Sequence, residues 1–205
     1  MSFTVGKFPS WPPRGAWDSR MVGPLFCPDL QPVEVVHENP WFTVRNRGGY
    51  FTAEPRWPQL VVLPIVDRDH VIMVRVIRPV IEDATLELPA GGFDPDRETA
   101  VQGAARELAE ETGVLVDDLD RFQPLPPLSV SPNRIPRLAY LFQVELTRAE
   151  FEQRRSHDQE IHSVHCFPLS DVADMILNGE VYVTMPVALI GRYWMARGVR
   201  RGERA

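Results

Sequence analysis

The stretch GGFDPDRETAVQGAARELAEETGVLV, residues 91–116, decides the fold, because it changes from turn-forming residues to a helical repeat within a few positions. Apolar residues recur in it at the spacing of one helix face: Val101, Ala104, Ala105 and Leu108. This spacing predicts an amphipathic helix over residues 99–112. Gly113 follows the last apolar turn, and a glycine in the left-handed conformation is a common end to a helix.

Three glutamates crowd one turn of this helix. Glu107 and Glu111 are four residues apart and Glu110 is three from Glu107, so their side chains share a face. Like charges at that spacing cost a helix at most about 0.5 kcal/mol per pair, which favours a cation beside them. Arg106 can supply part of that charge by pairing with Glu110 one turn later or with Glu98 two turns earlier. The remainder suits Mg²⁺ or Mn²⁺, which prefer carboxylate oxygens, although a Glu-rich turn is also typical of a solvated face.

These residues follow a longer pattern: Gly92, five residues, Glu98, seven residues, and then the run RELAEETGV at residues 106–114. The pattern resembles the complete Nudix box, with every defined position filled. Three further segments are similar to those that flank the box in the ADP-ribose pyrophosphatase branch of the family: IRPV, LELPAGG and SPNR. The resemblance covers residues 41–198, and it is most specific in the box.

Outside the helix, runs rich in β-branched and aromatic residues predict strands at 41–46, 49–54, 61–66, 71–80, 85–90, 137–146 and 161–169. The polar DRDH between the third and fourth of these makes them a candidate hairpin. Two closing helices are expected at 170–180 and 184–198, beginning at Ser170 and Thr184. The predicted fold class is α+β, an α/β/α sandwich with helices flanking a mixed sheet, as the Nudix resemblance implies.

The chain divides into two parts by composition. Residues 1–40 are rich in Pro and Trp without periodicity, which predicts an irregular N-terminal arm packed on the domain or on a partner subunit. Residues 41–205 are expected to form the Nudix hydrolase domain. The aperiodic, Trp-bearing start and the domain-exchanged dimers of the resembling branch together favour a homodimer, in which the arm and the strands around residues 41–55 contact the partner.

The resemblance implies a phosphohydrolase that cleaves a nucleoside diphosphate linked to another moiety. ADP-ribose or a similar nucleotide sugar is the expected substrate, giving a nucleoside monophosphate and a sugar phosphate. Mg²⁺, or alternatively Mn²⁺, would neutralise the phosphates and lower the pKa of a bound water. A nucleotide-binding sensor or regulator of the same fold, without catalysis, is the alternative, and a protein of that kind can lose the glutamates that this chain keeps.

The same resemblance assigns roles within the box. Glu107 and Glu111 are expected to bind the metal directly, while Glu110 shares a second ion or holds waters. Glu98 and Arg106 are expected to form a structural ion pair between the loop and the helix. A backbone carbonyl just before the box glycine completes the metal's shell in this family. Alignment on LPAG indicates the carbonyl of Ala90, whereas counting back from the box indicates the carbonyl of Gly91.

A catalytic base outside the box is expected in HDQEIH, residues 157–162, which offers Asp158 and Glu160. We take Glu160 as the candidate, although an exposed hairpin loop without a catalytic role would look the same. The histidines near Cys166 match no zinc-ligand spacing, and alternation along a strand explains them.

Three residues are candidates for binding substrate. Arg78 follows an apolar strand, and the resembling family places a substrate-binding arginine nearby, but a surface arginine at a strand end is equally compatible. Trp41 could stack on a base, although aromatic residues are more often buried in a core or a dimer interface. Arg134 could contact a phosphate or sugar. It lies in SPNR, which departs from the SPG form associated with ADP-ribose hydrolysis.

Composition and charge exclude several classes of protein. A net charge of −6 and a pI near 5.4 disfavour nucleic acid as the main partner, since its binding requires many basic contacts. Residues 1–15 lack an uninterrupted apolar core, and no window of 18 apolar residues occurs, so no leader or membrane segment is predicted. The two cysteines, Cys27 and Cys166, form no paired motif, which favours a reducing compartment and a cytoplasmic protein.

Overall fold

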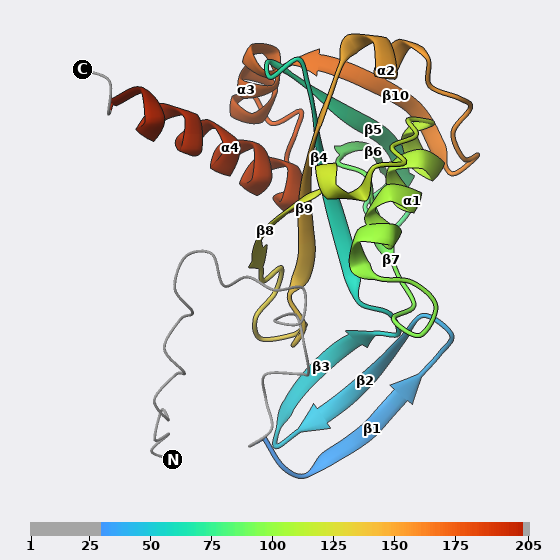
Figure 1. Ribbon diagram of the computed structural model, residues 1–205. Helices are drawn as coiled ribbons and strands as arrows, with labels where there is room; N and C mark the ends of the chain where they lie inside the picture. Colours follow the sequence, from blue (N-terminus) through green and yellow to red (C-terminus); the bar gives the residue numbers. More distant parts are fainter. Residues whose placement is uncertain (1–29, 203–205) are drawn as a thin grey trace.

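The computed structural model describes residues 30–202, which form two sheets and the helices that cover the larger one (Figure 1). The small sheet has the order β1-β2-β3 and consists of Val33–Glu38, Phe42–Arg47 and Tyr50–Pro55. The large sheet has the order β10-β5-β4-β9-β8, with β6 paired to β5 and β7 paired to β4. Residues 1–29 of the expected N-terminal arm lie outside the described part of the chain.

The strands of the large sheet are β4 (Gln59–Val66), β5 (His70–Arg78), β6 (Asp83–Glu87), β7 (Ala90–Gly92), β8 (Gln123–Leu128), β9 (Ala139–Leu146) and β10 (Ile161–Pro168). Strands β4 and β9 run parallel and the remaining pairs run antiparallel, so the sheet is mixed. The helices are α1 (Ala100–Thr112), α2 (Arg148–Glu152), α3 (Leu169–Leu177) and α4 (Thr184–Gly202), with a short 3₁₀ turn at Leu119–Arg121.

Helices cover both faces of the large sheet, because its central strands are apolar on both sides. Leu60 and Val62 of β4 pack with α1, whereas Val61 and Leu63 pack with α3 and α4. Figure 1 shows α1 on one side of the sheet and α4 on the other. The expected α+β class, with a mixed sheet between helices, is confirmed. Among residues 30–202, no helix contains an apolar segment of the length needed to cross a membrane.

The β4–β5 hairpin opens away from its turn, and this opening positions the candidate site. The two strands pair only at Ile65↔Val71 and Val66↔His70. Further along, β6 pairs with β5 and β7 pairs with β4, so the segment 83–92 fills the gap between the diverging strands. This segment leads directly into the loop before α1, which places the start of the box at the centre of the sheet.

Helix α1 forms where the sequence predicts it. Thr99 caps its first turn, and Gln102 bonds back to the Thr99 backbone in a capping box. The helix ends at Gly113, whose φ of 75° lies in the left-handed region. Gly103 faces the sheet, where a Cβ would lie 2.8 Å from Phe93 and 2.9 Å from Leu60. The absence of a side chain therefore lets α1 approach the sheet closely.

Several parts of the fold differ from the sequence prediction, including α2, which was not predicted, and the expected strand 85–90, which is divided between β6 and β7. Strand β1 lies within residues 1–40, where an irregular arm was expected, and it is exposed along its whole length. Strand β8 has the sequence QPLPPL, whose prolines lack backbone donors and fit because β8 is an edge strand. Helix α3 begins at Leu169 after Pro168, so Ser170 is not its N-cap. Helix α4 begins at Thr184, as predicted.

Candidate active site

The C-terminal half of α1 carries the three box glutamates at different depths. Only 8% of the Glu107 surface is exposed, because its carboxylate packs against the backbone of Gly91 in β7. A Cβ at Gly91 would occupy the place of that carboxylate, so a side chain there would force the Glu107 carboxylate to move. Glu111 is half-buried, whereas Glu110 lies at the surface. Burial of Glu107 raises the pKa of its carboxyl, although Arg106 opposes the shift.

Arg106 connects the loop of the box to its helix. Its guanidinium donates to Glu98 at 2.8 Å, to Glu107 at 2.9 Å and to Glu110 at 2.8 Å. It also donates to the carbonyl of Gly92 at 2.9 Å. The two pairings that the sequence offered as alternatives, with Glu98 and with Glu110, are both present. These contacts, of which the bond to Glu98 is the strongest, raise the pKa of Arg106 and keep it charged.

Glu111 makes a different contact. The backbone N–H of Ala90 donates to its carboxylate at 3.0 Å. Burial raises the pKa of Glu111 to about 8, with smaller contributions from Glu107 and Glu87 and an opposing one from the Ala90 N–H. Both residues considered as carbonyl ligands thus lie beside box carboxylates, Ala90 next to Glu111 and Gly91 next to Glu107.

Arg78, at the end of β5, lies on the same side of the site. It donates through Nε and Nη2 to the two oxygens of Glu87, at 2.7 and 2.9 Å. This bond to Glu87 raises the pKa of Arg78, and the charges of Glu111 and Glu160 add to the effect. Glu111 and Glu160, although far from Arg78 in the sequence, are therefore close enough for their charges to act on it.

The loop before β10 is attached to the end of α1 by its backbone. Asp158 donates its N–H to the carbonyl of Glu110 at 2.8 Å, and Arg155 donates to the carbonyl of Gly113 at 2.8 Å. Both acceptors are carbonyls near the helix end that lack partners within the helix. Glu160 follows two residues after Asp158 and is exposed.

The other two substrate-binding candidates lie at the small sheet. The backbone N–H of Trp41 donates to the Asn39 side chain, and 74% of the Trp41 surface is exposed. The carbonyl of Arg134 accepts from Ala53 of β3 at 2.7 Å. No hydrogen bond or ion pair within residues 30–202 joins either residue to the box glutamates. The described chain therefore groups Arg78 and Glu160 with the box, and Trp41 and Arg134 with the small sheet.

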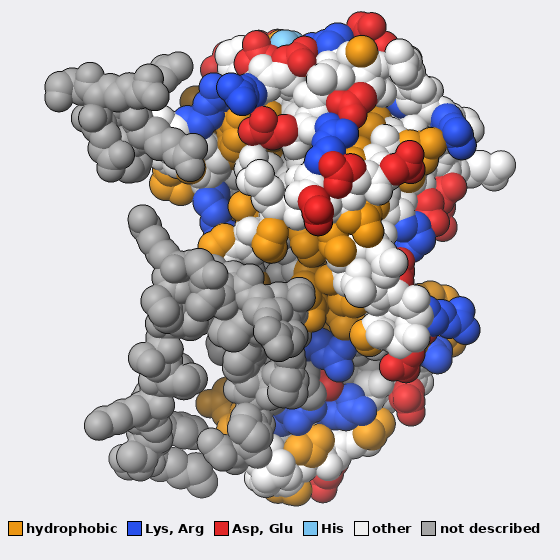
Figure 2. Space-filling model, viewed as in Figure 1, with side chains coloured by type: hydrophobic (Ala, Val, Ile, Leu, Met, Phe, Trp, Pro, Cys, Tyr) orange, Lys and Arg blue, Asp and Glu red, His pale blue; other side chains and the backbone are white. Residues whose placement is uncertain are grey.

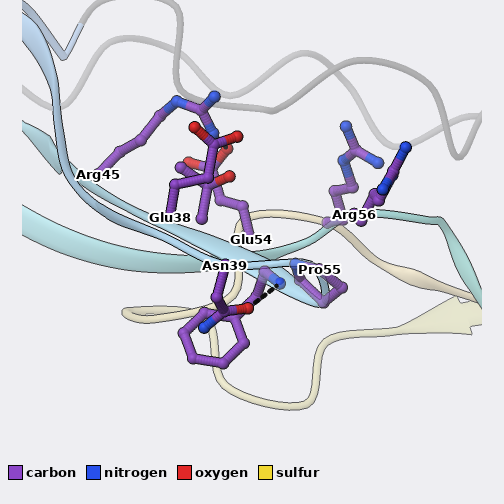
Figure 3. Close-up of a pocket in the computed structure, with 9 residues that line it drawn as sticks. Glu38, Asn39, Arg45, Glu54, Pro55 and Arg56 are labelled. Atoms are coloured by element: carbon purple, nitrogen blue, oxygen red, sulfur yellow. Dashed lines mark hydrogen bonds and ion pairs between the residues drawn. The ribbon is translucent and has the colours of Figure 1, made fainter.

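A pocket of about 400 Å³ opens at the small sheet (Figure 3). Its lining mixes three arginines with two glutamates and other side chains: Glu38, Asn39, Phe42, Thr43, Arg45, Glu54, Pro55, Arg56 and Arg137. Burial opposes ionisation of Glu54, but hydrogen bonds from Arg47 and Thr52 and nearby arginine charges lower its pKa overall. None of the box residues lines this pocket.

The donor set of the box fits a hard divalent cation. Glu107, Glu110 and Glu111 supply carboxylate oxygens, and Ala90 and Gly91 supply backbone beside them. Within residues 30–202, however, no three His, Cys, Asp or Glu side chains are already arranged as a metal cluster. Instead Arg106 holds Glu107 and Glu110. A bound cation would have to take oxygens from this arginine.

Sequence reasoning missed Glu87, which pairs with the substrate-binding candidate Arg78. The signal was present in TLELPA, where Thr85 and Glu87 alternate with apolar residues and thus share one face of a strand. A largely buried acidic side chain requires a partner, and Arg78 is the partner that the fold supplies.

Comparison with known proteins identifies the family of the chain. The family model described as the NUDIX domain matches residues 55–184, which include the whole large sheet and α1. An ADP-ribose pyrophosphatase of Bacillus subtilis (strain 168) is 28% identical over 123 residues, 60% of this chain and 64% of the relative. The chain thus spans less than two thirds of the length of that curated relative. Because the family match covers more than half of the chain, the protein belongs to the Nudix family.

Proposed function

We propose that the protein hydrolyses the pyrophosphate bond of a nucleoside diphosphate linked to another moiety. ADP-ribose or a similar nucleotide sugar is the proposed substrate, and a nucleoside monophosphate and a sugar phosphate are the products. The observation that carries the proposal is the complete carboxylate set on α1, with Glu107 and Glu111 set against the backbone of β7. The similarity to the Bacillus subtilis ADP-ribose pyrophosphatase supports the choice of substrate.

Glu107, Glu110, Glu111 and the Ala90 carbonyl would hold Mg²⁺, or Mn²⁺ in its place. The bound ion would neutralise phosphate charge and lower the pKa of a coordinated water. Glu98 pairs with Arg106, so that the loop and the helix of the box retain one geometry. Mg²⁺ is favoured over softer metals because all of these donors are oxygen atoms.

Two residues outside the box complete the proposed site. Arg78 would bind the substrate's phosphates, since half of its side chain is exposed and it lies near Glu111 and Glu160. Glu160 would act as the general base that accepts the proton of the attacking water. It is suited to this role because it is exposed and its loop is attached to the end of α1.

We further propose a homodimer in which the small sheet contacts the partner subunit. The small sheet exposes large apolar side chains: Val33, Val35, Val36, Trp41, Phe42, Tyr50 and Phe51. Figure 2 also shows apolar side chains, in orange, near the middle of the visible face. In such a dimer, Trp41 and Arg134 of one subunit would serve the site of the other. Sedimentation at micromolar concentration tests this, and a monomer would contradict it.

Purified protein with Mg²⁺ should release monophosphates from at least one member of a panel of ADP-ribose, ADP-glucose, a GDP-sugar, a dinucleoside polyphosphate and a coenzyme A derivative. EDTA should abolish the release. If the protein binds a panel member but releases no monophosphate with Mg²⁺ or Mn²⁺, the hydrolase proposal fails. In that case the chain is a nucleotide-binding module.

A further inference from the structure

Glu87 makes more specific contacts than an ordinary surface glutamate. Only 15% of its side chain is exposed, although it ends in a charged group. Its two carboxylate oxygens accept from Arg78 at 2.7 and 2.9 Å, and one of them also accepts from the Thr85 hydroxyl at 2.6 Å. Thr85 itself is 1% exposed, so this second donor is fixed by the core. The carboxylate is therefore held from two directions.

The register of β5 and β6 explains how Arg78 reaches this carboxylate. Glu87 lies opposite Val74 and Thr85 lies opposite Val76, whereas Arg78 is at the far end of β5. All five side chains alternate onto one face of the two strands. The arginine must extend back along the sheet, past Val76 and Thr85, to meet Glu87. Its guanidinium is thus brought from the strand end toward the start of β7.

This direction brings the arginine toward the box. Glu87 lies three residues before Ala90, whose backbone N–H donates to the Glu111 carboxylate at 3.0 Å. The pair occupies the Nε and Nη2 donors of Arg78, and Nη1 donates to no other group among the described residues 30–202. A bidentate pair fixes the plane of a guanidinium, so the remaining donors point in a defined direction.

We propose that Glu87 is a positioning residue: its carboxylate, anchored by Thr85, holds the Arg78 guanidinium in the orientation that binds the pyrophosphate of the substrate. The inference rests on the proposed function, because it takes Arg78 to contact the phosphates. Glu87 on β6 would then determine how tightly Arg78 binds the phosphates. A carboxylate so close to the anionic substrate would otherwise repel it, and the arginine's charge offsets that repulsion.

A double-mutant cycle tests this role through binding as well as turnover. The variants are Arg78→Ala, Glu87→Gln and the double substitution, and the measurement is the Kd of ADP-ribose by calorimetry in EDTA. Each single variant should raise Kd about tenfold, and the double variant should bind within about twofold of Arg78→Ala. With Mg²⁺, KM should rise more than kcat falls in Glu87→Gln. The less disruptive Thr85→Val should change Kd in the same direction by about threefold.

The matched control is Glu150→Gln, which changes the carboxylate of another bidentate arginine pair, Arg121–Glu150, neither member of which belongs to the box. It should leave Kd and KM unchanged. The proposal would be overturned if Glu87→Gln bound ADP-ribose with wild-type affinity. It would also be overturned if the rise in Kd of the double variant equalled the product of the two single rises. Coupled binding without any release of monophosphate would leave the positioning role standing and reject the hydrolase. A wild-type protein that does not bind ADP-ribose would overturn the positioning role for this substrate, while release of monophosphate from another panel member would keep the hydrolase.

Discussion

The backbone N–H of Asp158 donates to the carbonyl of Glu110 at 2.8 Å, which joins the loop before β10 to the last turn of the helix that carries the box. Arg155 makes a second such bond to Gly113. Two segments far apart in the chain are thereby held together by hydrogen bonds between main-chain atoms. The position of Glu160 relative to α1 depends on this attachment.

Gly113→Ala should weaken this attachment. A Cβ at Gly113 would collide with the Arg155 carbonyl, and the φ of 75° is unfavourable for any residue with a side chain. Gly179→Ala is the control, because Gly179 has a φ of 85° but nothing lies within 4 Å of its Cβ position. In urea unfolding we expect losses of about 3 kcal/mol for Gly113→Ala and about 1 kcal/mol for Gly179→Ala. Equal losses would show that the collision does not contribute.

The Arg121–Glu150 pair gives a pH-dependent contribution to stability. The hydrogen bond from Arg121, ahead of the other causes, lowers the pKa of Glu150 to about 2. A carboxyl whose pKa is lower in the folded state stabilises the fold above its unfolded pKa of about 4.5, and this contribution is lost as pH falls toward 2. Wild-type protein should therefore be more stable than Glu150→Gln at pH 7, and the difference should shrink between pH 5 and pH 3.

The pair is about one third exposed, so its contribution should stay below about 1 kcal/mol. Urea unfolding of both proteins across this pH range measures it. A difference that stays constant from pH 7 to pH 3 would mean that the Glu150 charge has no role in stability.

Substrate selectivity should be relaxed compared with a strict ADP-ribose hydrolase. The loop AGGFDPDRE is one residue longer than the form expected after LPAG, and Asn133 stands where the SPG form has a glycine. This loop contains a turn in which the Asp94 carbonyl accepts from the Glu98 N–H at 3.0 Å, and Arg106 donates to the Gly92 carbonyl before it. Because helix geometry sets the positions of the glutamates on α1, we expect the metal site to be retained. Selectivity for the group attached to the second phosphate should decrease first.

The measurement is kcat/KM for ADP-ribose, ADP-glucose and a GDP-sugar under identical Mg²⁺. We expect preferences below about 10³-fold, which corresponds to roughly 4 kcal/mol. Asn133→Gly should increase the preference for ADP-ribose. A wild-type preference above 10³-fold would contradict this prediction.

The elements that carry the site were predictable because their signals are local. The apolar period, the Thr99 cap and Gly113 define α1 within about fifteen residues, and the Glu98–Arg106 pair follows from box spacing. Helix geometry fixes the relative positions of side chains three and four apart, so the face that carries Glu107 and Glu111 could be inferred without tertiary information.

Other features depend on contacts that a single sequence does not reveal. The prolines of β8 oppose a strand unless its place at a sheet edge is known, and β1 shows no alternation because it is exposed on both faces. Glu87 meets Arg78 only because β5 and β6 pair in one register. Glu107 is buried because β7 lies against its carboxylate. The periodicity of the helix does not predict this contact.

We propose that the buried carboxylates of α1 hold the metal that activates pyrophosphate hydrolysis. The most direct test is kcat for ADP-ribose at saturating Mg²⁺ in wild-type protein and in Glu107→Gln and Glu111→Gln, with Glu150→Gln as the control. Each box variant should lose at least about 10²-fold in kcat, or about 2.7 kcal/mol of transition-state stabilisation, while unfolding as cooperatively as wild type. Wild-type kcat in either folded box variant would contradict the account.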